Sequence, residues 1–303
     1  MLRYTKYYNS LEVTMSKKQA FLLICLSALW GSSFMFMRLL APVFGAAGTA
    51  GFRLLVGALT LIVYFLVINY RIPWKKHWKL LVVIGLINSA LPFFLYAFAA
   101  LHIPSSLSVM INASSPIFGA IFAAILLKEP IETKTALGLL LGLIGVGIMS
   151  GSKALPKDAI GFLSLAACVG AAACYGLSGA IIKRWGKALD PKDLAGGSQL
   201  FAAAVLLPIF FYQGPSVAIE AWHVGLMLIF GALCSGIAYL IYYYLMQSIG
   251  PTKTLTVTYL MPVFGVVWGR LLLSEALYVE MLLGGIIILA GTYLVTRKKS
   301  NPS

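Results

Sequence analysis

The stretch NASSPIFG at residues 112–119 returns as TYLMPVFG at residues 258–265, and in both copies a glutamate follows ten positions after the glycine. The copies are 146 positions apart, and the matched residues are Asn112, Pro116, Phe118, Gly119 and Glu129 with Thr258, Pro262, Phe264, Gly265 and Glu275. The same offset pairs Ser89 with Ser235 and Gly138 with Gly284, and an offset of 145 pairs Trp30 with Tyr175. The pattern predicts two repeats, residues 17–151 and 158–299, after an N-terminal segment of residues 1–16.

The composition is that of a membrane protein. Charged residues make up 11% of the 303, while apolar residues make up 60% and the mean hydropathy is +0.93. A helix needs roughly 20 apolar residues to cross a bilayer. Ten such stretches occur, at about 20–40, 47–68, 79–100, 106–127, 134–151, 160–182, 195–212, 223–247, 254–273 and 279–296. We predict an all-α polytopic membrane protein with ten transmembrane helices, five in each repeat.

An odd number of spans per repeat forces the second copy to face the opposite way across the bilayer, and such inverted repeats are typical of transporters. With the N-terminus in the cytoplasm, 18 of the 23 Lys and Arg residues fall on the cytoplasmic side. This bias predicts that both termini are cytoplasmic. The short loops and compact size favour an inner (cell) membrane. Met15 is an alternative start, which N-terminal sequencing would test. The net charge of +14 is spread over alternate loops, so we expect no nucleic-acid partner.

Three prolines inside spans, Pro92, Pro116 and Pro262, are predicted to kink their helices. Pro116 and Pro262 each follow a polar residue by four positions, Asn112 and Thr258, so the kink and the polar group share a helix face. One interpretation is a binding element that lines a cavity. The other is that each proline only shapes its helix and each polar side chain bonds a freed carbonyl.

Polar and aromatic stripes on apolar helices give the remaining candidates, because a polar group unpaired in hydrocarbon is costly. Trp30 and Ser33 in the first span match Tyr175 and Ser178 in the sixth. The third and eighth spans carry such stripes as well, at Asn88, Tyr96, Ser235 and Tyr239. We expect these side chains to line a cavity, with core packing as the alternative. Tyr242 to Tyr244 lie near a span end and favour an interfacial belt instead.

The ionisable residues are few. No Asp or Glu lies mid-span, so the intramembrane carboxylate of a proton-driven pump is missing. Glu129 and Glu275 lie just before a helix begins, where the helix dipole favours a carboxylate, so we predict structural roles for both. Arg53 lies inside the second span. We favour a structural role for it as an outer-leaflet anchor over the alternative, contact with a substrate carboxylate.

The segment Ala28-Leu29-Trp30-Gly31-Ser32-Ser33-Phe34, the pair Phe52-Arg53 and the two Pro/Glu segments together resemble the drug/metabolite transporter superfamily, in its EamA-type branch. The resemblance covers residues from about 18 to 296. It implies two inverted five-helix bundles and a central cavity lined mainly by spans 1, 3, 4, 6, 8 and 9. It also implies alternating access for small metabolites, often amino acids leaving the cell. Ser198 stands where the second copy would have an arginine, so any role of Arg53 belongs to one half only.

We therefore predict an exporter or facilitator of small organic metabolites, amino acids or related compounds and possibly drugs. A lipid or prenyl-carrier flippase of the same fold is the alternative, and a membrane-embedded enzyme is less favoured. The partners are a small-molecule substrate and the bilayer, with no cofactor and no metal. The predicted substrate-binding residues are Trp30, Ser33, Asn88, Tyr96, Asn112, Ser115, Tyr175, Ser178, Ser235, Tyr239, Thr258 and Tyr259. Glycines in the fifth and tenth spans favour helix packing over a dimer seam, so we expect a monomer or weak homodimer.

Overall fold

The computed structural model describes residues 15–296 except 152, 187–188, 250–252 and 255. The predicted N-terminal segment up to residue 14 and the end of the second predicted repeat, 297–299, lie outside the described residues. Within the described chain all regular structure is helical. The elements are α1 (Lys17–Val67), α2 (Trp74–Ile84), η1 (Gly85–Ala90), α3 (Leu91–Ala100), α4 (Ser105–Asn112), α5 (Ser115–Leu127), α6 (Thr133–Ser150), α7 (Ala159–Trp185), α8 (Pro191–Gln213), α9 (Ala221–Phe230), η2 (Gly231–Ile237), α10 (Ala238–Ser248), α12 (Val257–Leu273) and α13 (Val279–Thr296).

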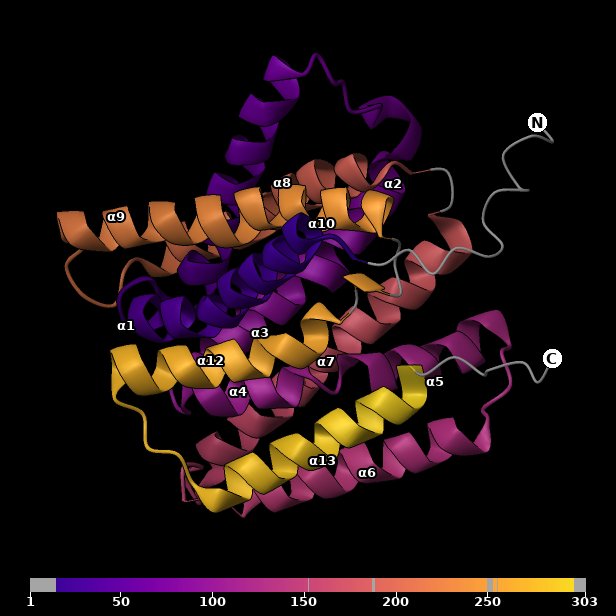
Figure 1. Cartoon of the computed structure of the whole chain (residues 1–303). Coiled ribbons are helices and arrows are strands. Elements are labelled where there is room, and N and C mark those ends of the chain that lie inside the picture. Colours follow the sequence, from indigo (N-terminus) through magenta and orange to yellow (C-terminus); the bar gives the residue numbers. More distant parts are fainter. Residues whose placement is uncertain (1–14, 152, 187–188, 250–252, 255, 297–303) are drawn as a thin grey trace.

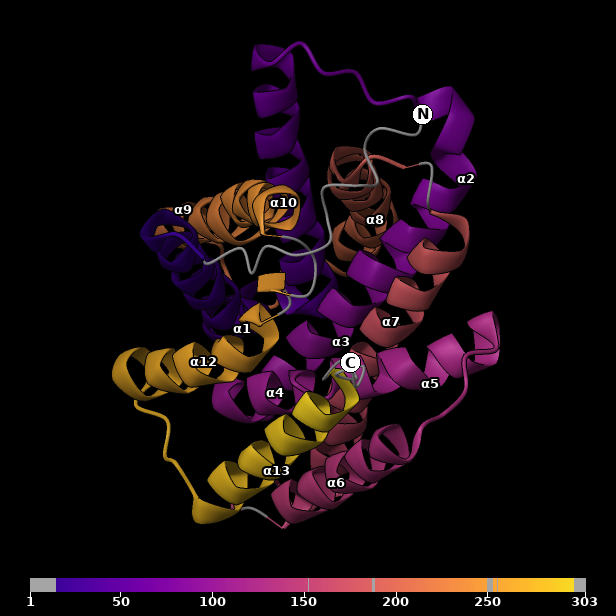
Figure 2. The same ribbon diagram turned by 45° about the vertical axis from the view of Figure 1, so that its right-hand side comes forward.

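Helix α1 consists of two helical parts that join at Gly45, whose φ of 65° and ψ of 177° are not helical. Glycine suits this position because it adopts positive φ without steric cost. A straight helix of 51 residues would be roughly 77 Å long, more than twice the roughly 30 Å of a bilayer core. Figures 1 and 2 show the two parts, indigo and purple, running in different directions. Each part is long enough to cross a bilayer by itself.

The chain is a polytopic membrane protein. Seven helices among the described residues are long and apolar enough to cross a bilayer, and α6 and α12 are shorter apolar helices. Large apolar side chains such as Leu66, Phe211 and Leu271 remain exposed on these helices. Side chains of this kind are stable in contact with lipid but form costly patches in water. The all-helical polytopic prediction is confirmed.

Two repeat-related helices, α6 and α13, pack directly against each other (Figures 1 and 2). A Cβ added to Gly138 would lie 2.6 Å from the carbonyl oxygen of Gly291, and one added to Gly145 would lie 2.7 Å from that of Gly284. The order of these pairs makes the helices antiparallel. Because Gly138 corresponds to Gly284 and Gly145 to Gly291, the seam has two-fold pseudosymmetry. Such pairing is what an inverted duplication requires.

The same symmetry relates two further contacts that join the repeats. Gly31 of α1 packs against the backbone of Gly265 in α12, and its counterpart Gly176 of α7 packs against Gly119 in α5. An added Cβ would lie 3.0 Å and 2.5 Å from the respective backbone nitrogens. The first helix of each repeat therefore packs against a helix of the other repeat. Both repeats contribute to the space between them.

Candidate functional site

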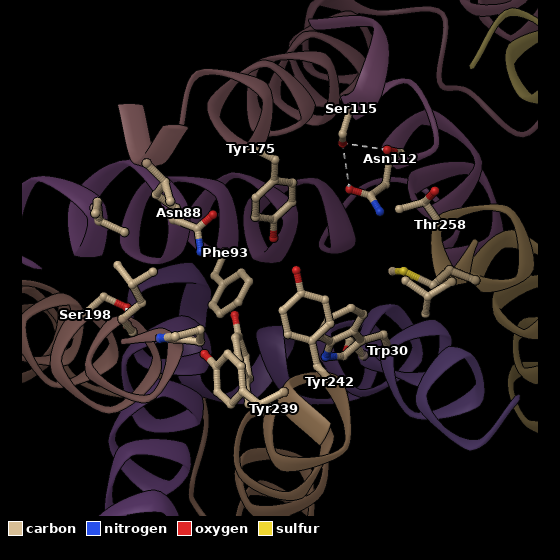
Figure 3. A pocket seen from close by; sticks show the side chains of 18 of the residues that line it. Trp30, Asn88, Phe93, Asn112, Ser115, Tyr175, Ser198, Tyr239, Tyr242 and Thr258 are labelled. Carbon is tan, nitrogen blue, oxygen red and sulfur yellow. Dashed lines mark hydrogen bonds between the residues drawn. The ribbon is translucent and has the colours of Figure 1, made fainter. Parts of the chain in front are cut away.

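A cavity of about 440 Å³ lies between helices of both repeats (Figure 3). Nine of the predicted substrate-binding residues line it: Trp30, Ser33, Asn88, Tyr96, Asn112, Ser115, Tyr175, Tyr239 and Thr258. These residues come from α1, η1, α3, α4, α5, α7, α10 and α12. In Figure 3, Tyr175 and Tyr242 extend into the cavity from opposite sides. The volume suits a small organic molecule.

Three predicted residues do not line this cavity. Ser178 is fully buried in α7, and its hydroxyl has no hydrogen-bond partner among the described residues. Ser235 lies in η2 and accepts a hydrogen bond of 2.8 Å from Arg53 Nε. The Tyr259 hydroxyl points to α13, where it bonds the carbonyl oxygen of Thr292 at 3.3 Å and the hydroxyl of Thr296. We predicted these three side chains in the cavity from their spacing along the helices, but each lies on a helix face that turns away from the cavity.

An aromatic cluster forms much of the wall. The ring of Trp30 lies 5.8 Å from that of Tyr239 and 5.4 Å from that of Tyr242. On the facing wall the Tyr96 and Tyr175 rings stack at 6.3 Å, and the repeat equivalents Trp30 and Tyr175 thus lie in opposite parts of one lining. Such rings provide flat apolar surface together with polar edges.

The belt expected at Tyr242 to Tyr244 is wrong for two of the three residues. Tyr242 lines the cavity, and Tyr243 both lines it and is buried. Only Tyr244 is exposed, where Lys18 lies 5.2 Å from the centre of its ring. The span end suggested an interface with lipid headgroups, but α10 turns this face inward.

The polar part of the lining gathers at the break between α4 and α5. Asn112 is the last residue of α4, and Pro116 is the second residue of α5, where the missing N–H of proline is not needed. Tyr96 donates a hydrogen bond of 2.9 Å to Asn112 Oδ1. Ser115 donates to the backbone carbonyl oxygen of Asn112 at 2.6 Å, as Figure 3 shows. The amide of Asn112 is thereby held in a fixed orientation beside the cavity.

The other predicted kink prolines occupy different places. Pro92 is the second residue of α3, directly after η1, and Pro262 lies inside α12. The π-helical segments η1 and η2 occur at the same repeat position. A proline does not explain both π-helical segments, because Ala238 stands at the repeat position of Pro92. Single π-helical turns are rare in proteins as a whole, and those that occur frequently lie at functional sites.

Each π-helical segment contacts the helix that carries the Arg53 or Ser198 position. A Cβ on Gly85 of η1 would lie 2.5 Å from the carbonyl oxygen of Ser198, and a Cβ on Gly231 of η2 would lie 3.0 Å from that of Arg53. Only glycine permits such close backbone approach. Both Arg53 and Ser198 line the cavity.

Arg53 is almost completely buried, with 3% of its surface exposed. Its Cζ atom lies 3.9 Å from the centre of the Phe93 ring and 4.6 Å from that of Phe230. Besides the bond from Nε to Ser235, Nη2 donates to Ser33 Oγ at 3.3 Å. The predicted outer-leaflet anchor is therefore wrong, because the side chain lines the cavity and contacts protein on several sides.

The two glutamates make unlike contacts. Glu275 accepts hydrogen bonds from the backbone N–H groups of Ser105 and Ser106, at 2.7 and 3.0 Å, and from the Ser106 hydroxyl at 2.6 Å. It thus caps α4 of the first repeat, a favourable place for a carboxylate. Glu129 instead forms an exposed ion pair with Lys183. Among the described residues, no group of three His, Cys, Asp or Glu side chains is placed to hold a metal ion.

The connection between α1 and α2 contacts the start of α8. Tyr70 donates a hydrogen bond of 2.9 Å to Asp193 Oδ1, and Lys192 Nζ lies 4.7 Å from the centre of the Tyr70 ring. Burial and the hydrogen bond to Asp193 raise the pKa of Tyr70, so this hydroxyl stays protonated at neutral pH. The contact joins the α1–α2 connection to the start of α8, where the neighbouring Pro191 and Leu194 line the cavity.

A bundle of membrane-spanning helices in two related halves, with a cavity between them, defines the class of membrane transporters built from internal repeats. Residues 17–151 and 162–297 both match the EamA-like transporter family, and the chain belongs to this family. The transporter YvbV of Bacillus subtilis is 24% identical over 93% of this chain and 92% of its own length. The threonine/homoserine exporter RhtA of Escherichia coli K12 is 27% identical over 92% of both chains.

A solved crystal structure shares the fold. It superposes with a TM-score of 0.64 at 17% identity, and the match covers 91% of this chain and 96% of that one. A chloroplastic WAT1-related protein of Arabidopsis thaliana is 25% identical over 90% of this chain and 68% of its own. These similarities extend over nearly the whole chain, so the family assignment concerns the complete helical bundle.

Proposed function

We propose that this transporter carries small organic metabolites, amino acids or related compounds, by alternating access, as an exporter or facilitator. The observation that carries the proposal is the cavity of about 440 Å³ that both repeats line with aromatic, apolar and uncharged polar side chains and with the single charged residue Arg53. A site between two inverted repeats is where such carriers bind their solutes. The name of the relative RhtA, an exporter of threonine and homoserine, supports this substrate class and the outward direction.

We place ten spans in the membrane, with both termini in the cytoplasm of the cell. The two parts of α1 count as two spans, and α6 and α12 count despite their shorter helices. The positive-inside bias supports this orientation. The α7–α8 connection, with Lys183 and Arg184 before it, then lies on the cytoplasmic side.

The drive is the solute gradient in this proposal. No Asp or Glu side chain is among the residues that line the cavity in the described part of the chain. Intramembrane carboxylates are the usual proton carriers of pumps. Without one at the solute, a facilitator or exchanger is the simplest mechanism.

Counterflow in proteoliposomes tests the proposal. Vesicles are loaded with pooled unlabelled amino acids, nucleosides or hydrophobic cations, and uptake of each labelled counterpart is followed without an ion gradient. Accumulation of labelled amino acids is the expected result. Uptake only after a proton or sodium gradient is imposed would contradict the gradient-free mechanism. Movement of lipids alone, or turnover of a lipid, would replace the proposal with a flippase or an enzyme.

A further inference from the structure

The guanidinium of Arg53 lies against two aromatic rings at the cavity wall. Phe93 of α3 and Phe230 of α9 are 3.9 and 4.6 Å from its Cζ atom. A guanidinium is planar, and stacked rings cover its faces while its N–H groups point outward in the plane. Phenylalanine side chains carry no oxygen or nitrogen acceptor, so the N–H groups of Arg53 need other partners.

Three of the five guanidinium hydrogens have no acceptor among the described residues. Nε donates to Ser235 Oγ at 2.8 Å, and one hydrogen of Nη2 is used by Ser33 Oγ at 3.3 Å. Both acceptors are neutral hydroxyls. The two hydrogens of Nη1 and one of Nη2 remain. One hydrogen from each of two guanidinium nitrogens is what a carboxylate needs for two parallel hydrogen bonds.

The charge of Arg53 has no acidic partner within the described chain. The ion pairs there join Lys134 to Glu132 and Lys183 to Glu129, both far from this residue in sequence and partly exposed. No carboxylate side chain lines the cavity. A buried charge that contacts only neutral groups is costly, and an anionic ligand offsets that cost.

The second repeat lacks this charge at the corresponding place. Ser198 occupies the repeat position of Arg53, lines the same cavity, and turns its hydroxyl to the backbone of Leu194. The π-helical segments approach both positions in the same way, so the scaffold is symmetric while the charge is not. The scaffold at these positions therefore does not by itself require a cation, because the second repeat has the same close contact with Ser198 in place of Arg53.

We infer that Arg53 binds the carboxylate of the transported solute, and that the substrates are small organic monocarboxylates with an apolar or aromatic body, amino acids included. The inference rests on the proposed function. A single arginine in an apolar, aromatic lining suits one negative charge rather than the two of a phosphate monoester. Hydrophobic cations are disfavoured at this site because they meet the same positive charge without an acid to neutralise it.

Binding of a matched pair of compounds to purified protein in detergent tests this assignment. The pair is 3-phenylpropionate and 3-phenylpropanamide, which share size and shape and differ in charge. Affinities are measured by calorimetry and by thermal shift. We expect the wild type to bind the carboxylate at least tenfold more tightly. Arg53→Met should reduce this preference to about onefold, and Arg53→Lys should give an intermediate value, because lysine keeps the charge but not the planar fork.

The control is Arg71→Met, which removes a positive charge from an exposed residue outside the cavity lining and should leave the preference unchanged. If Arg53→Met does not fold, the wild-type preference and the Arg53→Lys ratio decide. Equal binding of the two compounds by the wild type, no binding of either, or a preference that survives in Arg53→Met overturns the inference.

Counterflow separates this inference from the proposed function. Carriage of uncharged nucleosides with no preference for carboxylates would overturn the role of Arg53 and leave a metabolite carrier. Absence of counterflow for every solute class would overturn the proposed function itself. Carboxylate-dependent counterflow that is lost in Arg53→Met supports both.

Discussion

The hydroxyl of Tyr96 and the amide of Asn112 form a buried hydrogen bond of 2.9 Å between α3 and α4. Interhelical hydrogen bonds in membrane proteins contribute about 0.6 kcal/mol on average and about 1.7 kcal/mol at most. Tyr96→Phe removes the donor and should lower the thermal stability of the purified protein by an amount in this range. Tyr175→Phe is the matched control, because the Tyr175 hydroxyl makes no hydrogen bond with the described residues. Equal loss of stability in the two variants would contradict this account.

Single residues of the site were predictable where they broke a local rule. Trp30 and Asn112 were found because their repeat positions carry an aromatic residue, Tyr175, and a polar residue, Thr258, inside apolar spans. The sequence showed Arg53 as a charge inside a span. Its burial and its contacts with Phe93 and Phe230 were not predictable, because the three residues lie on three separate elements. Phenylalanines in an apolar helix give no signal that separates a cavity wall from a lipid-facing surface. Only the assembled helices distinguish these environments.

At the scale of elements, the seam between α6 and α13 depends on glycine. A Cβ on Gly145 would lie 2.6 Å from Ile288 Cγ1 and 2.7 Å from the Gly284 carbonyl oxygen. Gly145→Ala should therefore separate the helices and destabilise the protein by about 1–3 kcal/mol, the usual cost of overpacking. Loss of melting temperature and of monodisperse yield measures it.

Gly147 of the same helix gives the control. A Cβ at this position has no heavy atom within 4 Å, so Gly147→Ala should leave stability equal or raise it, since alanine is the better helix former. If Gly147→Ala is as damaging as Gly145→Ala, the seam is not the reason for the glycines. A change in oligomeric mass in Gly147→Ala alone would favour the dimer seam.

Hydrophobicity and proline positions predicted approximately where helices begin and end, but they did not predict which segments are π-helical. The separate apolar stretches at about 20–40 and 47–68, with Pro42 and Gly45 between them, anticipated the two parts of α1 that join at Gly45. The π-helical segments had no counterpart in the prediction, because the insertion of one residue into a turn leaves the apolar pattern of a short segment unchanged. The close backbone contacts of Gly85 and Gly231 suggest that packing against the neighbouring helix selects this geometry.

At the scale of the whole molecule, the two ends of the bundle differ. The cavity lining continues to Gly186, Leu189 and Pro191 between α7 and α8. At the other end Glu275 caps α4, and Arg38 donates to the carbonyl oxygen of Ala100. The duplication was predictable from the sequence because matched residues recur at a nearly constant offset. The different contacts at the two ends were not predictable, because repeat-related residues have the same local sequence signals and differ only in their partners.

The cap on α4 should hold its end of the cavity closed. Glu275→Gln removes the charge and replaces one acceptor oxygen with a donor that opposes the N–H groups of Ser105 and Ser106. Hydrogen bonds to charged groups contribute about 1.5–3 kcal/mol, so the open fraction at this end should rise about tenfold or more. The measurement is the labelling rate of Met37→Cys, a cavity residue, by a membrane-impermeant maleimide in a background without the four native cysteines.

Glu129→Gln is the control, because the exposed pair with Lys183 contributes only about 0–1 kcal/mol and should leave that rate within about twofold. If Glu275→Gln labels no faster than wild type from the capped side, closure does not depend on this carboxylate, and the packing of α4 against α12 is what seals that end.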